Sequence, residues 1–311
     1  MNLDELAARA VGAWGGSSHA PRLLSHRENA VFEVDLPGGR AALRLHRPGY
    51  RTDGHILSEL SWTRQLVETG FPAPEPVAKL DGGWIEALGE GQRATCIGWM
   101  DGAPIGEGGD VLTPDSVSEY ADTGALLARL HEATIAMGAD QFDRPRWDID
   151  GLTGEQPLWG RYWEMARLSE AQRDLVIASR DKARARLRGY GGEVTLIHTD
   201  ALRENVFRGS YGLGLIDFDD AGFGYVMYDL AASVTQLVDD PLYGEVRAAI
   251  MDGYASVRGL RDEDRAAFDM FAMLRAFSAL GWTMPRMATD HPKLPTYVRR
   301  AVVMAEEFMA S

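Results

Sequence analysis

The spacing of apolar residues divides the chain into a strand-rich first third and a helix-rich remainder. Residues 22–46 alternate over three apolar runs, with Pro37–Gly39 between the last two, and predict three successive strands. Residues 53–69 carry apolar positions near one helical face, and Asp53 is placed to cap that helix. Two further strands are expected at 77–80 and 93–97, around a turn at 81–83.

Helical periodicity dominates beyond Pro104, and this change marks a domain boundary. We expect a first domain over 1–98 and a second domain over 99–311, and the second domain begins with the hinge. Residues 147–154 have no regular pattern. The predicted helices cover 116–131, two segments within 158–188, and then 228–237, 242–257, 262–282 and 297–309. Three short apolar runs interrupt them and predict strands at 194–197, 205–207 and 213–216, the last two forming a hairpin.

Three oxygen-bearing side chains follow these short strands. Asp200 comes after the first strand, Asn205 opens the second, and Asp217 ends the third. A hairpin of this length is expected to bring Asn205 and Asp217 to one end of the ribbon, where two hard oxygen ligands suit Mg²⁺. An Asp, an Asn five residues later and a further Asp is the order that phosphoryl transfer from ATP uses for its base and its metal ligands. The alternative is that all three residues are turn and cap residues, where Asp and Asn are common.

The segment from Ile216 to Ala231 is typical of the aminoglycoside phosphotransferase and choline kinase family, and the chain most resembles its homoserine-kinase-like and stress-response-kinase-like branch. The resemblance implies a two-lobed, protein-kinase-like α+β fold with a small antiparallel-sheet N-lobe and a larger, mostly helical C-lobe. It also implies that Asp200 is the catalytic residue, that Asn205 and Asp217 are the metal ligands, and that Asp229 braces the catalytic loop from a helix.

The first lobe offers candidates for binding the nucleotide. Arg44, on the third predicted strand, occupies the place where kinases need a cation for the phosphates, and Glu59 is its expected partner on the following helix. The turn over the phosphates has no glycine; Glu28 and Asn29 match the turn that relatives use instead. The alternatives without a binding role are that Arg44 is a solvated arginine on a strand and that Glu59 is an exposed glutamate on a helix.

The hinge is expected to bind adenine through its backbone. Kinase-like folds use this segment for the adenine edge, so side-chain identity carries little information there. The three expected contacts are Ile97, Trp99 and Met100.

Two groups of residues are candidates for the acceptor pocket. Trp159, Tyr162 and Trp163 would share one face of a helix, either as a pocket wall for a cationic substrate or as ordinary packing. Asp219 and Asp220 lie just beyond Asp217, where they would meet an ammonium group of the acceptor or cap the next turn.

Composition excludes several other classes of protein. The formal net charge of −14 argues against nucleic-acid binding, and the single cysteine, Cys96, excludes a disulfide framework. No apolar run is long enough to cross a membrane, and the first residues do not resemble a signal peptide, so we expect a cytoplasmic location.

The sequence therefore predicts an ATP- and Mg²⁺-dependent phosphotransferase that acts on a hydroxyl of a small molecule, such as an amino alcohol, a sugar or an antibiotic. Asp200 would orient and deprotonate that hydroxyl. One alternative is a serine/threonine protein kinase, although residues 218–228 are too short for an activation segment. Another is a nucleotide-binding module without catalysis. The chain is expected to act as a monomer or homodimer.

Overall fold

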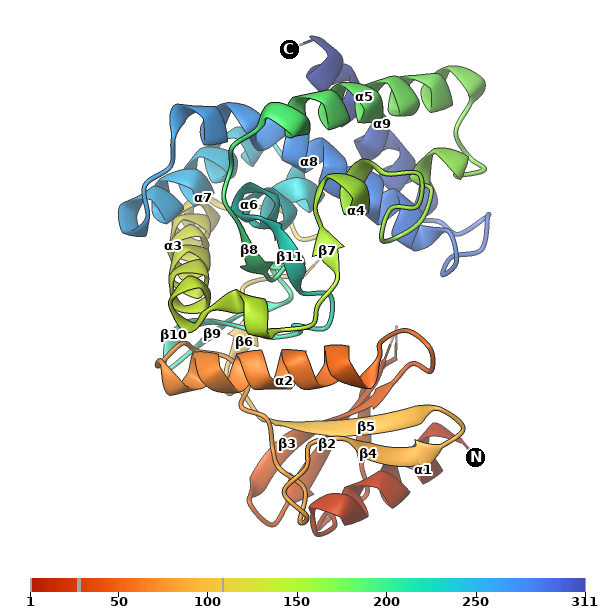
Figure 1. Ribbon diagram of the computed structural model, residues 1–311, viewed down its shortest axis with the longest axis vertical. Helices are drawn as coiled ribbons and strands as arrows, with labels where there is room; N and C mark the ends of the chain where they lie inside the picture. Colours follow the sequence, from red (N-terminus) through yellow and green to blue (C-terminus); the bar gives the residue numbers. More distant parts are fainter. Residues whose placement is uncertain (1, 27–28, 108, 311) are drawn as a thin grey trace. The chain divides into compact units, whose positions relative to one another are not determined.

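The computed structural model describes residues 2–26, 29–107 and 109–310, and these divide into two compact units. Unit 1 comprises 1–103, 137–144 and 208–219, and unit 2 comprises 104–136, 145–207 and 220–311. The chain therefore crosses between the units several times, and the segment that ends at Asp219 belongs to unit 1. The sequence predicted a single boundary after residue 98. Figure 1 shows both units in ribbon form.

Unit 1 is built on a five-stranded antiparallel sheet with α2 (Asp53–Glu68) running alongside it (Figure 1). Its strands, in spatial order, are β1 (Arg22–His26), β2 (Ala30–Leu36), β3 (Gly39–His46), β5 (Gln92–Gly98) and β4 (Glu86–Gly89). Alternate residues of β2 and β3, such as Phe32 and Leu43, are fully buried, as expected for strands with one face on a core. The short α1 (Leu3–Ala10) and the 3₁₀ turn η1 (Val11–Trp14) complete that core.

Two details of unit 1 differ from the prediction. Residues 77–80 form no strand; only Pro76 bridges to β5, and the neighbour of β5 is β4. The hairpin turn lies instead at Gly89–Gly91, where three successive residues have positive φ. Thr52 rather than Asp53 caps α2, because its hydroxyl accepts a hydrogen bond from the backbone N–H of His55.

Unit 2 is mostly helical, and its longest buried element is α8 (Asp262–Thr283). This helix packs against α6 (Val226–Val234) and α9 (Leu294–Ala310). The remaining helices are α3 (Pro114–Met137), α4 (Ile149–Thr153), α5 (Glu170–Gly189) and α7 (Tyr243–Val257). Helices α3 and α7 cross so closely that a Cβ at Gly253 would lie 1.8 Å from the carbonyl oxygen of Ala121, and this contact requires glycine.

Short strands flank the loops that contain Asp200 and Asp217. β8 (Val194–Ile197) pairs with β11 (Gly222–Tyr225), which also pairs with β7 (Arg146–Trp147). A second small sheet contains β9 (Val206–Gly209), β10 (Gly212–Leu215) and β6 (Ala103–Pro104). The strands predicted at 194–197, 205–207 and 213–216 are therefore confirmed, with ends that move by one or two residues.

The prediction of two helices within 158–188 is wrong for the first of them. Only the 3₁₀ turn η3 (Tyr162–Glu164) forms there, and α5 begins after its cap Ser169. Pro157 and Gly160, whose φ is +96°, interrupt a regular helix at this point. Residues 147–154, which have no regular pattern in the sequence, contain α4, whose first turn is capped by the side chain of Asp148.

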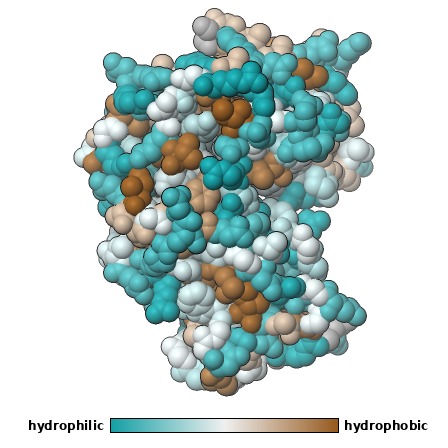
Figure 2. Space-filling model, viewed as in Figure 1, coloured by the Kyte–Doolittle hydropathy of each residue, from teal (hydrophilic) through white to brown (hydrophobic). Residues whose placement is uncertain are grey.

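The surface seen in Figure 2 is mostly hydrophilic, with hydrophobic residues in small separate groups, as is usual for folded chains. Among the residues that the structure describes, no helix combines the length and apolar character needed to cross a membrane.

Candidate active site

A buried ion-pair cluster in unit 1 contains the cation that the sequence predicted on β3. Nη1 of Arg44 lies 2.7 Å from Oε1 of Glu59 on α2, and Nη2 lies 3.3 Å from Oδ1 of Asp217. Arg44 and Glu59 are buried, whereas the side chain of Asp217 is 52% exposed. Burial alone would lower the pKa of Arg44, but the carboxylates of Glu59, Asp217 and Asp219 outweigh it and hold that pKa above its usual range. The guanidinium thus stays charged and is oriented toward the Asp217 carboxylate.

A second buried cation, Arg144, supports the same cluster. Its Nη1 lies 3.9 Å from Oε2 of Glu59, and its Nη2 donates to the carbonyl oxygens of Phe218 and Asp219. Arg144 therefore fixes the backbone immediately after Asp217. Sequence reasoning missed this residue, since it lies in an irregular segment without a motif.

Asp219 is buried and held within unit 1. Its Oδ2 accepts a hydrogen bond of 3.0 Å from Nδ2 of Asn29, and Oδ1 lies 4.0 Å from Nε of Arg51. Burial raises the pKa of this carboxyl, but Arg44 and Arg51 outweigh that effect, so the pKa lies below its usual value. The sequence offered Asp219 as a partner for an acceptor ammonium, but its described partners are side chains of unit 1. Glu28, predicted beside Asn29, lies outside the described residues.

Two residues of the predicted loops have left-handed backbone conformations. Asp217 has φ of +65° and Thr199 has φ of +70°. Such values are uncommon for residues other than glycine and are rarest for β-branched residues such as Thr. They occur where the surrounding structure imposes them, and they cluster at functional sites.

The loop around Asp200 in unit 2 is braced by Asp229, in the first turn of α6. Both oxygens of this fully buried carboxylate accept backbone hydrogen bonds, from His198 and from Thr199. Oδ2 also lies 3.0 Å from Nε2 of the buried His131, whose Nδ1 lies 3.1 Å from the hydroxyl of Tyr254. Asp229 thus has the bracing role that the family resemblance implied.

The carboxylate of Asp200 is held from two sides. Its Oδ1 accepts a hydrogen bond of 2.6 Å from Nη2 of Arg275 on α8. Its Oδ2 accepts one of 3.2 Å from Nδ2 of Asn205, which also donates to the Asp200 carbonyl oxygen. The N–H of Asp200 lies 3.3 Å from Nδ1 of His198, so the His198 ring supports the loop. Asp200 keeps a side chain that is 24% exposed, which leaves the carboxylate accessible to a substrate.

The aromatic residues predicted for the acceptor pocket do not share one helical face. Tyr162 and Trp163 are buried on η3 and meet edge to face, with Tyr162 also 4.9 Å from the ring of Phe277. This is core packing. Trp159 is half-buried and contacts Trp147 at 4.8 Å, so it keeps more exposed surface than Tyr162 and Trp163.

Asp220 lies in unit 2, and its backbone carbonyl accepts hydrogen bonds from Trp147 and Thr199. Its side chain is half-buried. The main chain at Asp220 therefore connects the strand that carries Trp147 to the catalytic loop.

The predicted hinge is partly engaged within unit 1. Ile97 pairs with Ala42 in the sheet, and the N–H of Trp99 donates to the carbonyl of Arg40 at 3.2 Å. The Trp99 ring lies under the guanidinium of Arg40, with 3.6 Å from the Arg40 Cζ to the ring centroid. Met100 lies against Gly214, where an added Cβ would be 2.8 Å from the Met100 Cε.

Each unit offers an oxygen atom of the kind that suits a hard divalent cation. In unit 2, the amide nitrogen of Asn205 donates to the Asp200 carbonyl and carboxylate, and its amide oxygen is the candidate ligand. Asp217 offers a half-exposed carboxylate. No group of three or more His, Cys, Asp or Glu side chains able to hold a metal occurs among the described residues. Each of the two oxygens can serve as one ligand of a hard cation, whose other positions phosphate oxygens and water would fill, as is common for Mg²⁺.

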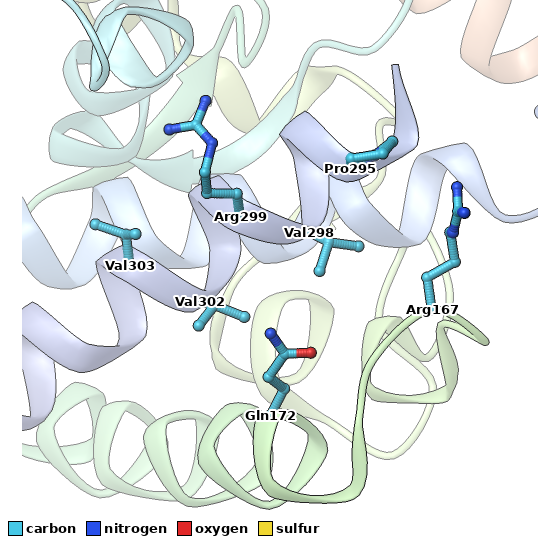
Figure 3. Close-up of a pocket in the computed structure, with 7 residues that line it drawn as sticks. All are labelled: Arg167, Gln172, Pro295, Val298, Arg299, Val302 and Val303. Atoms are coloured by element: carbon cyan, nitrogen blue, oxygen red, sulfur yellow. The ribbon is translucent and has the colours of Figure 1, made fainter. Parts of the chain in front are cut away.

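A pocket of about 390 Å³ lies between α5 and α9, away from these residues (Figure 3). Its walls come mainly from α9, and Arg299 in its lining pairs with Asp239. None of the predicted site residues lines this pocket. Its lining residues are Arg167, Gln172, Pro295, Val298, Arg299, Val302 and Val303.

Comparison with known proteins identifies the family of this chain. The model of the phosphotransferase enzyme family matches residues 19–287. A homoserine kinase of Neisseria meningitidis serogroup B is 29% identical over 250 residues, which cover 77% of this chain and 74% of that protein. The structure of a microcompartment-associated aminopropanol kinase superposes with a TM-score of 0.85 at 27% identity and covers 98% of this chain and 97% of that one.

An amicoumacin kinase, solved in complex with AMP-PNP, Ca²⁺ and Ami, has a TM-score of 0.77 at 18% identity, with 99% and 94% of the two chains covered. That likeness shows the fold, which is the two-lobed, kinase-like α+β fold expected from the sequence. The family match extends over most of the chain and includes every residue of both loops described above. The chain therefore belongs to the phosphotransferase enzyme family and is a kinase of small molecules.

Proposed function

We propose that this kinase transfers the γ-phosphate of Mg²⁺·ATP to the hydroxyl of a small amino alcohol, with Asp200 as the base. The observation that carries the proposal is the Asp200 carboxylate, which is fixed by Arg275 and Asn205 but still partly exposed. A general base must be held in one orientation and must reach the proton that it accepts.

The nucleotide would be bound chiefly by unit 1. Arg44 presents a permanently charged guanidinium that can contact phosphate oxygens by two N–H groups, and Glu59 fixes its orientation. Asn29, next to the turn that would lie over the phosphates, is held by Asp219 and by the N–H of Arg47. At the hinge, the N–H of Trp99 is already used by Arg40, which favours Met100 as the backbone contact for adenine.

The reaction then needs little covalent chemistry from the protein. The acceptor oxygen forms a bond to the γ-phosphorus, the bond to the β-γ bridging oxygen breaks, and ADP leaves with that electron pair. The acceptor proton moves to the Asp200 carboxylate. A Mg²⁺ ion bound by Asn205 and Asp217 would neutralise the phosphate charge. Because the transition state is loose, most of the acceleration comes from positioning and charge neutralisation.

The acceptor class follows from chemistry that the relatives share. Homoserine and aminopropanol, in the names of two similar proteins, are both small molecules that carry one hydroxyl and one amino group. The half-buried Trp159, packed on Trp147, offers an aromatic face near Arg275. The Asp220 carboxylate is a candidate partner for the ammonium group.

The decisive experiment compares the wild type with Asp200→Ala and with Asp290→Ala, an exposed aspartate as the matched control. ADP release is measured with a panel of amino alcohols, sugars and antibiotics, and Mg²⁺·ATP binding is measured by calorimetry. We expect Asp200→Ala to lose transfer while it keeps ATP affinity, and Asp290→Ala to match the wild type. Full turnover by Asp200→Ala would disprove the assignment of the base, and transfer only to protein substrates would disprove the acceptor class.

A further inference from the structure

Arg275 is an unusual residue for the middle of α8. Its neighbours Leu274, Ala276 and Phe277 are buried and apolar, and Arg275 itself is only 6% exposed. Its Nε is buried and has no hydrogen-bond partner among the described residues. Burying a guanidinium costs several kcal/mol of desolvation free energy. One good ion pair restores only about that amount. A helix that served packing alone would be more stable with an apolar side chain here.

The partner of this costly cation is the proposed base. Nη2 of Arg275 lies 2.6 Å from Oδ1 of Asp200, although the two residues are 75 positions apart in the chain. The guanidinium also lies over Trp159, with its Cζ 5.0 Å from the ring centroid, and Trp159 is fixed edge to face against Trp147. Arg275 is therefore locked between an aromatic wall and one oxygen of the carboxylate.

The second oxygen of Asp200 is bound from a different element. Asn205 donates to Oδ2 from within the catalytic loop, at 3.2 Å. Two donors on opposite oxygens remove the freedom of the carboxylate to rotate about its Cβ–Cγ bond. Without Arg275, the Asn205 contact alone would leave that rotation much less restricted, since a single hydrogen bond is compatible with several orientations.

We propose that Arg275 is a positioning residue for phosphoryl transfer, which acts by holding the Asp200 carboxylate in the orientation that receives the acceptor hydroxyl. It touches neither the nucleotide nor the reacting atoms in this role. The inference rests on the proposed function of Asp200. Its consequence is that loss of Arg275 lowers kcat and leaves the KM for ATP unchanged, because the ATP-binding cluster lies on other residues.

The magnitude follows from the sensitivity of catalysis to geometry. A displacement of about 1 Å in a catalytic group can reduce the rate by about 100-fold. We expect Arg275→Met to lower kcat by roughly that factor, and Arg275→Lys to recover part of it, because an ammonium can still bind Oδ1 without the planar fork. The matched control is Arg247→Met, which removes another arginine that pairs with α8, through Asp269.

The test is a double-mutant cycle between the two residues, measured as kcat with a fixed acceptor. The variants are Arg275→Met, Asp200→Asn and the combination of both. If Arg275 acts through Asp200, its substitution should add no further loss in the Asp200→Asn background. An equal further loss in that background would overturn the proposal, as would a full kcat in Arg275→Met.

A second measurement keeps the proposal testable if Arg275→Met folds poorly. In Arg275→Ala, added guanidinium ion should restore part of kcat by filling the space of the missing group, with no change in the KM for ATP. Absence of any restoration, together with Arg275→Lys no better than Arg275→Met, would also overturn it. The two proposals fail separately: an active Asp200→Asn defeats the proposed function, whereas an inactive Asp200→Asn with a fully active Arg275→Met defeats only this inference.

Discussion

Asn29 donates a hydrogen bond from its side-chain amide to Oδ2 of Asp219, 3.0 Å away, across 190 positions of sequence. The other end of the same amide accepts the N–H of Arg47 at 3.0 Å. One short side chain therefore joins the turn before β2, the end of β3 and the loop that carries Asp217. This connection fixes Asn29 against the end of β3 and the segment that carries Asp219.

Asn29→Ala should raise the KM for ATP by about tenfold with a smaller change in kcat. The substitution removes a hydrogen bond to a buried charged group, worth about 1.5–3 kcal/mol, and frees the Asp219 carboxylate beside Arg44 from one of its partners. Steady-state kinetics over a range of ATP concentrations would measure this. The control is Asn2→Ala, which removes the cap of α1 and should cost about 1 kcal/mol of stability without changing the KM. An unchanged KM in Asn29→Ala would contradict the predicted role.

Arg44→Met should destabilise the protein by about 3–5 kcal/mol, because it leaves Glu59 buried with only the more distant Arg144 nearby. Adding Glu59→Met should restore much of that stability, since an apolar pair of similar volume needs no desolvation of charge. ATP binding should stay lost in both variants. Urea unfolding and calorimetric titration with ATP would test the two statements independently, and a double variant less stable than Arg44→Met would contradict the first.

The stability of the protein should depend on pH through His46, next to the Arg44 cluster. Burial, followed by the nearby Arg44 cation, lowers the pKa of this imidazole to about 4 from an ordinary value of 6.5. The neutral form is therefore the one that favours folding. Its contribution is complete above pH 6.5 and is lost progressively as the pH falls toward 4, which amounts to about 3 kcal/mol at 1.36 kcal/mol per pKa unit.

His46→Gln removes this titration but keeps a group that can bond to the hydroxyl of Thr95, the present partner of Nε2 at 2.9 Å. The free energy of unfolding of this variant should decline less steeply between pH 6.5 and 4 than that of the wild type. The exposed His19→Gln serves as the control and should follow the wild-type curve. Parallel curves for all three proteins would show that His46 does not titrate as described.

Asp217→Asn should raise the Mg²⁺ concentration needed for half-maximal activity by at least tenfold, because it replaces a charged hard ligand by a neutral one. EDTA should abolish turnover of the wild type, and excess Mg²⁺ should restore it. Titrating Mg²⁺ at constant ATP in both proteins gives the comparison. Equal Mg²⁺ requirements would indicate that the cation is bound without Asp217.

The regular elements follow from local pattern, and the errors occur where distant contacts decide. The strands around Asp200 and the helix of Glu59 have clear apolar periodicity, and both were predicted. Residues 77–80 look equally strand-like, yet they are excluded because β4 takes the place beside β5. The spacing of Tyr162 and Trp163 suits a helix, but the positive φ of Gly160 interrupts a regular helix just before them. Both residues therefore lie on a 3₁₀ turn.

The residues of the candidate site also fall into those that follow from local sequence and those that depend on distant contacts. Asp200, Asn205 and Asp217 could be proposed from the sequence because their spacing is short and chemically constrained. Arg144 and Arg275 are not, since each reaches its partner from a segment about 75 residues or more away. An arginine in an amphipathic helix looks like any surface arginine until the fold is known. From its place in the chain, Asp219 was offered either as a partner for the acceptor or as a turn cap, and its hydrogen bond to Asn29 could not be inferred from that place.

The left-handed backbone at Thr199 and Asp217 sets a limit on engineering this enzyme. Glycine would adopt those dihedral angles without steric cost, so selection for heat resistance alone would tend to favour it at both places. At position 217 the same exchange deletes a carboxylate that is proposed to hold the cation. A library for thermostable variants should therefore keep these two codons fixed, and should treat any gain obtained there as a warning of lost turnover.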